Sequence, residues 1–217
     1  MRLVLAVLAG CCLAAAEELP AGVDQLVNID AIVGFPEEFE AEAIAVDPQG
    51  AVYIAGTLES VPDGVTALFT TGEFGKANVL VVKMDAELEH VLYKVIIGGS
   101  DREILYAMAV SETGEVFLCG VTESRDFPET ANFEQPPSSP NDQRAFVLKL
   151  NAAGDRLAYS ALLDAGVGPH AIAVDADGAA LIAGRASGLS LPTTPGVQYP
   201  FPPPDHFRSF LAKLNAT

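Results

Sequence analysis

The chain has 217 residues, and half of them are hydrophobic, which is typical of a folded protein and excludes a disordered one. Its 29 acidic residues against 12 basic residues give a formal net charge of −17. With so few cations to neutralise phosphate groups, we expect no nucleic acid as a partner and no docking on an anionic membrane surface.

Residues 1–16 predict an export signal. Arg2 precedes an apolar and small-residue run that ends at Ala16 and is too short to span a bilayer. A second interpretation stays open, because Leu8-Ala9-Gly10-Cys11 is similar to the bacterial lipoprotein box, in which Cys11 would carry the lipid. Both interpretations place residues 17–217 outside the cytoplasm, either secreted or periplasmic, and neither adds a membrane span.

A short segment then recurs three times, beginning at Ala43, Ala107 and Ala171, a step of 64 residues. Each copy holds two apolar runs separated by a polar turn. Glycines keep the same step, at positions 50, 114 and 178 and at positions 56, 120 and 184. A fixed period of this length predicts one supersecondary unit that is used three times.

Each unit contains two hairpins. The turns at residues 47–50, 111–114 and 175–178 begin with Asp or Ser and end with Gly, the turn chemistry that joins antiparallel strands. A second hairpin follows, and its first strand carries Lys83 or Lys149. Four antiparallel strands per unit predict an all-β protein built of β-propeller-type blades.

The predicted units cover residues 34–97, 98–163 and 164–217, with a variable, proline-rich connection between the two hairpins. The third unit stops before its fourth strand. Residues 24–33 resemble that strand, so we expect them to supply it and to hide the open sheet edge.

The second and third units resemble the SBBP beta-propeller repeat, which occurs in exported bacterial proteins. The resemblance rests on two sets of residues, Tyr106-Ala107-Met108-Ala109-Val110 with Asp126-Phe127-Pro128-Glu129-Thr130, and Ala171-Ile172-Ala173-Val174-Asp175 with Leu191-Pro192-Thr193-Thr194-Pro195. It implies a propeller fold and an exported location, and it carries no catalytic residues. The first unit departs from the pattern at residues 61–64.

Three blades are fewer than the four to eight that are typical of propellers. Three outcomes are open: a homodimer that completes a six-bladed ring, an open three-unit array, and a strained closed monomer.

Few side chains point to chemistry. His90, His170 and His206 share no metal-ligand spacing, and Cys119 has no second cysteine in the mature chain, so we expect it to be a small buried apolar residue. The recurring Lys83, Lys149 and Lys213 predict either a ring of charge or a structural role in which they cover the sheet or protect its edge. We therefore expect no catalytic, cofactor-binding or metal-binding residue.

Two functions remain. The first, which we favour, is a non-enzymatic binding or structural scaffold whose partner is a protein or a glycan. The alternative is a secreted hydrolase or lyase acting on polysaccharide, which would need charged residues such as Arg125, Asp126, Asp205 and Arg208 to converge in one cleft.

Overall fold

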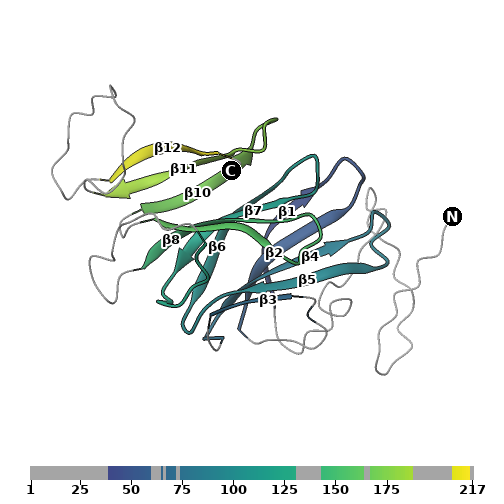
Figure 1. The fold of residues 1–217 in the computed structure, drawn as a ribbon, viewed down its shortest axis with the longest axis horizontal. Helices are drawn as coiled ribbons and strands as arrows, with labels where there is room; N and C mark the ends of the chain where they lie inside the picture. Colours follow the sequence, from purple (N-terminus) through teal and green to yellow (C-terminus); the bar gives the residue numbers. More distant parts are fainter. Residues whose placement is uncertain are drawn as a thin grey trace, which may run out of the picture.

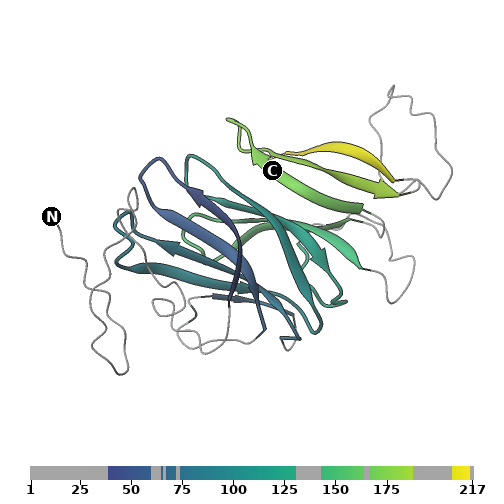
Figure 2. The same cartoon turned by 180° about the vertical axis from the view of Figure 1, so that it is seen from behind.

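A computed structural model describes residues 39–59, 65, 67–71, 74–130, 143–163, 167–187 and 207–215. Its regular structure in these ranges is entirely β: twelve strands form three sheets (Figures 1 and 2). No helix long and apolar enough to cross a membrane is found among the described residues. The predicted signal at residues 1–16 and the predicted strand at residues 24–33 lie outside them.

The three sheets follow one another along the chain. The first has the strand order β1-β2-β4-β5-β3 and comprises β1 (Glu40–Val46), β2 (Val52–Leu58), β3 (Ala67–Phe69), β4 (Asn78–Met84) and β5 (Val91–Ile97). The second comprises β6 (Glu103–Val110), β7 (Val116–Thr122), β8 (Arg144–Leu150) and β9 (Leu157–Leu163). The third comprises β10 (Val167–Val174), β11 (Ala180–Ser187) and β12 (Phe207–Leu214).

The predicted hairpins are confirmed, because strands that are neighbours in these sheets pair antiparallel in chain order. The third sheet holds three strands in the described part of the chain, as expected. One strand was not predicted: β3, from the connection between the hairpins of the first unit, pairs parallel with β5.

The first turn of each sheet is built in the same way. The Asp47 carboxylate accepts hydrogen bonds from the backbone N–H groups of Gln49 at 3.0 Å and Ala51 at 2.9 Å, and Gly50 closes the turn at a φ of 87°. Asp175 does the same in the third sheet. In the second sheet the Ser111 hydroxyl accepts one such bond at 3.1 Å. The predicted turn chemistry is therefore confirmed in all three copies.

The recurring glycines at positions 56, 120 and 184 also have a structural cause. The first strand of each sheet carries a β-bulge opposite this glycine, between Ala41 and Ala43 in the first copy. A Cβ placed on Gly56 would lie 1.8 Å from the carbonyl oxygen of Glu40, and the other two glycines approach the bulged strand as closely. Any side chain here would collide with backbone, so the bulge requires glycine.

Successive sheets pack face to face. Strand β6 lies against β1, β2 and β4, and β10 lies against β6, β7 and β8. The second sheet thus stands between the other two, and the third stands at one end of the molecule (Figure 1). Between the first two sheets the core contains Tyr53, Val79, Val81, Val95, Leu105, Leu118, Phe146 and Leu148. Between the second and third it contains Cys119, Val147, Ile182, Ile172, Phe210 and Leu214.

The packing predicts a contrast in stability between buried and exposed positions of the first sheet. Val81 is completely buried against the second sheet, whereas Leu92 on β5 is 53% exposed. Val81→Ala removes two buried methyl groups and leaves a cavity, so we expect it to lower the free energy of unfolding by about 2 kcal/mol.

Leu92→Ala serves as the control and should change the free energy of unfolding by less than about 0.5 kcal/mol. Urea denaturation of both variants measures the difference. Equal effects of the two substitutions would contradict the packing between the first and second sheets.

Candidate functional site

The recurring lysines pair with acidic residues at the first turn of their own sheets. The Lys83 Nζ lies 3.7 Å from Asp47 Oδ2, and the Lys213 Nζ lies 2.6 Å from Asp175 Oδ2. In the second sheet, where Ser111 replaces the aspartate, the Lys149 Nζ lies 2.9 Å from Glu115 Oε1. A carboxylate is therefore kept for each lysine, although its position in the turn changes.

These contacts decide between the interpretations of the lysines. Lys83 and Lys149 lie on β4 and β8, which are interior strands, so the prediction that they protect a sheet edge is wrong for them. Lys83 also lies over the Tyr53 ring, 4.8 Å from its centroid, and Lys149 lies 5.2 Å from the centroid of Phe117. Each lysine is neutralised within its own sheet, and its role is structural.

In the first and third sheets the aspartates of these pairs favour the charged form. Burial opposes ionisation of Asp47, but hydrogen bonds from Tyr53, Ala51 and Gln49, together with Lys83, outweigh it and hold the pKa of Asp47 below its ordinary value. For Asp175 the main cause is the hydrogen bond from Lys213, which lowers the pKa of that carboxyl. Both groups are therefore ionised at neutral pH.

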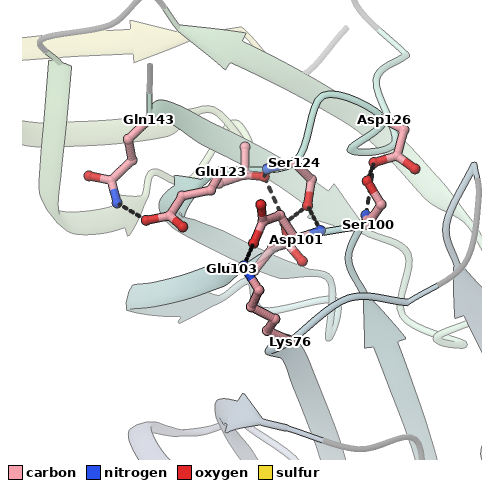
Figure 3. Close-up of polar contacts among 9 residues, drawn as sticks. Lys76, Ser100, Asp101, Glu103, Glu123, Ser124, Asp126 and Gln143 are labelled. Carbon is pink, nitrogen blue, oxygen red and sulfur yellow. Dashed lines mark hydrogen bonds and ion pairs between the residues drawn. The ribbon is translucent and has the colours of Figure 1, made fainter. Parts of the chain in front are cut away.

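A second polar cluster lies at the junction of the first and second sheets (Figure 3). Its centre is Glu103, at the start of β6, which is completely buried. The Glu103 carboxylate accepts hydrogen bonds from the hydroxyls of Thr122 at 2.7 Å and Ser124 at 2.6 Å, and from the Gly99 N–H at 3.0 Å. These donors tie the loop that leaves the first sheet to the end of β7.

Burial raises the pKa of Glu103, against the hydrogen bonds from Ser124, Thr122 and Gly99 that lower it. At the same position of the repeat the first and third units carry Phe39 and Val167, which are buried apolar residues. The carboxyl therefore replaces an apolar side chain in the second unit alone.

Asn78 lies beside this carboxyl. A Cβ placed on Gly98 would lie 2.2 Å from Asn78 Oδ1 and 2.7 Å from Glu103 Oε2, so the two oxygens face the same point. Asn78 is buried, and its side-chain amide has no hydrogen-bond partner among the described residues.

Other acidic side chains at this junction also have hydrogen-bond or ion-pair partners. The Asp126 Oδ1 accepts hydrogen bonds from the backbone N–H and the hydroxyl of Ser100, both at 2.8 Å. Lys76 pairs with Asp101 at 2.8 Å. The junction is a network of structural contacts between the two sheets, in which every carboxylate named here has a partner.

The residues named for the enzyme alternative are spread over the chain. Asp126 follows β7 at the junction, Arg125 is exposed beside it, and Arg208 lies on β12 of the third sheet. Asp205 lies outside the described residues. The structure therefore brings Arg125 and Asp126 together through chain adjacency, and it places Arg208 on a different sheet.

Among the described residues, the cysteine and the histidines named in the sequence analysis take no part in these clusters. Cys119 is buried between the second and third sheets, as predicted, and burial raises the pKa of its thiol to about 12, which makes it unreactive. His90 Nδ1 lies 2.7 Å from Asp85 Oδ2 on an exposed hairpin. His206 lies outside the described residues. Among the described residues no group of three or more His, Cys, Asp or Glu side chains could hold a metal ion.

The bulges place one side chain per sheet on an exposed row. The extra residues of the three bulges are Glu42, Tyr106 and His170, which keep the step of 64 residues. The rings of Tyr106 and His170 stack, with centroids 5.5 Å apart and an interplanar angle of 28°. Both side chains are exposed. We call Glu42, Tyr106 and His170 the bulge row.

The bulge row was not predicted from the sequence. The sequence does mark its three residues, because each directly precedes Ala43, Ala107 or Ala171 and lies opposite a glycine that the bulge requires. An exposed aromatic pair held by rigid backbone is a surface that can bind a ligand, because aromatic side chains contribute large contact areas at low entropic cost.

No protein-family model and no curated protein matches the chain. The resemblance to the SBBP repeat thus rests on the residues quoted for it.

The carboxylate that pairs with the lysine comes from a different turn position in the second sheet. A second substitution should therefore restore the stability that is lost when Glu115 is removed. Glu115→Ala leaves Lys149 buried without its partner, so we expect the free energy of unfolding to fall by about 3 kcal/mol. Adding Ser111→Asp rebuilds the arrangement of the first and third sheets and should restore most of this loss. Chemical denaturation measures both variants.

Glu112→Ala, at an exposed position of the same turn, is the control and should have little effect. If Ser111→Asp restores nothing in the Glu115→Ala background, the equivalence of the three turns is wrong.

The raised pKa of Glu103 predicts a pH dependence of stability. The folded state holds this proton more tightly than the unfolded state, so the contribution is complete below the ordinary value of 4.5 and is lost as pH rises through the raised pKa. Glu103→Gln stays neutral at every pH. Its stability relative to the original protein should therefore increase as pH rises above the ordinary value of 4.5.

Asp126→Asn is the matched control of opposite sign. Burial raises the pKa of Asp126, but the hydrogen bonds from Ser100 outweigh it and lower the pKa below 3.8. Its ionised form stabilises the fold above that value, so the deficit of Asp126→Asn should grow as pH rises from about 3 to 5. Urea unfolding across this range measures both; a parallel pH course for the two variants would contradict the assignment.

Proposed function

We propose that the protein is an extracytoplasmic, non-enzymatic scaffold of the β-propeller type that binds a neutral glycan through the bulge row. The observation that carries this proposal is the stacked, exposed pair of Tyr106 and His170 on the bulges of two successive sheets. An aromatic ring face fits the apolar face of a sugar ring, and His170 beside Tyr106 offers a hydrogen-bonding group at its border.

The repeated sheets support the propeller part of the proposal. The second unit is a four-stranded antiparallel sheet, and the first has the same four antiparallel strands with β3 added at its edge. The first strands of successive sheets lie against one another, and the bulges and turns recur. These are the features of propeller blades. The residues that resemble the SBBP repeat and the export signal at residues 1–16 support an extracytoplasmic location.

Charge favours a neutral ligand. With a formal net charge of −17, the surface would repel acidic polysaccharide, whose binding needs clustered Lys or Arg. A non-enzymatic role is supported by Glu103, whose raised pKa would otherwise suit an acid catalyst, because its carboxyl is completely buried and bonded to three protein donors.

A glycan array that contains neutral and acidic oligosaccharides tests the proposal. We expect the purified chain to bind neutral glycans, and Tyr106→Ala to weaken that binding by about tenfold or more, because it removes the exposed ring. Leu92→Ala, at an exposed apolar position away from the bulge row, should bind as the original protein does.

Absence of binding to any glycan on the array, or binding that Tyr106→Ala leaves unchanged, would contradict the proposal. Release of reducing sugar from a bound polysaccharide would instead favour the hydrolase or lyase.

A further inference from the structure

The third sheet exposes a face that is buried in the other two. Sheet register places Ala171, Ala183 and Leu211 in one row and Ala173, Leu181 and Lys213 in the next. We call these six residues the outer face. The matching residues of the second sheet, among them Cys119, Val147 and Phe117, are completely buried beneath the third sheet. Leu211, in contrast, is 75% exposed.

On β1 the first sheet exposes part of the other half of the same interface. Further along this face, Leu80, Val82 and Ile96 are buried in a cluster with Phe39 and other residues of the same chain. Strand β6 packs on the first sheet with Met108 and Val110, and β10 packs on the second sheet with Ile172. The matching residues of β1 are Ile44 and Val46, which have no preceding sheet to cover them and are 70% and 60% exposed. We call Ile44 and Val46 the leading face.

The two exposed faces are complementary because the chain already joins such faces twice, between the first and second sheets and between the second and third. The described strands of the first and third sheets share no substantial contact with each other, so these two sheets do not cover each other's exposed faces. Repeat arrays need terminal units with polar outer surfaces, whereas Ile44 and Val46 at one end of the described array and Leu211 at the other are exposed apolar side chains.

We propose that the leading face of one copy packs on the outer face of a second copy, and that two such contacts close a dimer of six sheets. A head-to-tail contact either closes a ring or extends into a filament. Two copies give six sheets, within the range of four to eight that closed propellers have, whereas three copies would give nine. The occupant of the outer face is therefore a second copy of this chain.

The contact depends on the packing of sheets and not on glycan binding, so the failure of one proposal leaves the other standing. It also accounts for Lys213, whose side chain is 49% exposed although Lys149, its counterpart, is 7% exposed. In the dimer the Lys213 side chain would be covered, as the Lys149 side chain is covered within the chain.

Light scattering coupled to size-exclusion chromatography tests the proposal with the purified chain at several concentrations. We expect a dimer. Leu211→Lys and Ile44→Lys each place a charge in both contacts of the dimer, so each variant alone should be a monomer with an unchanged circular dichroism spectrum. Leu92→Lys, outside both faces, should remain a dimer.

An equimolar mixture of Leu211→Lys and Ile44→Lys separates a head-to-tail contact from a symmetric one. The unaltered Ile44 of the first variant can meet the unaltered Leu211 of the second, so one contact re-forms and the mixture should recover a dimer at a higher concentration than the original protein needs. The proposal is overturned by a monomeric original protein, by an open series of larger assemblies, by Leu211→Lys that stays dimeric, or by a mixture that stays monomeric.

Discussion

The structure depends on the burial of one sheet face against the next. In the first and second sheets this face is made of small and branched apolar residues, such as Ala55 and Val81, and it is closed by a tyrosine or phenylalanine that carries a lysine above its ring. No disulfide links the described residues, in which Cys119 is a free thiol. Non-covalent contact between neighbouring sheets therefore provides the stability, as in other repeat proteins.

Much of the fold could be predicted from the sequence, because the features that build it are local. The turns, the strand order within each hairpin and the buried role of Cys119 follow from residue types at a constant step. The segments that recur in the sequence adopt the same local structure, because the same residue types make the same contacts in each copy.

The candidate sites could be predicted less well, because they arise where copies differ. Glu103 stands where the other units have Phe39 and Val167, and its partners come from a loop and a strand end that no spacing connects. In the second sheet Ser111 stands where the other sheets have an aspartate, and Glu115 supplies the carboxylate for the lysine. This substitution is recognised only from the contact between Lys149 and Glu115. Tyr106 and His170 lie 64 residues apart in the sequence, and only the packing of β10 on β6 brings their rings together.

Amide hydrogen exchange, followed residue by residue at a concentration at which the chain is monomeric, tests this packing most directly. The second sheet is covered on both faces, so the amides of β7 and β8 should exchange most slowly. The amides of β11, the interior strand of the third sheet, whose outer face is open, should exchange faster. Equal protection of β7 and β11 would contradict a fold held together by contacts between neighbouring sheets.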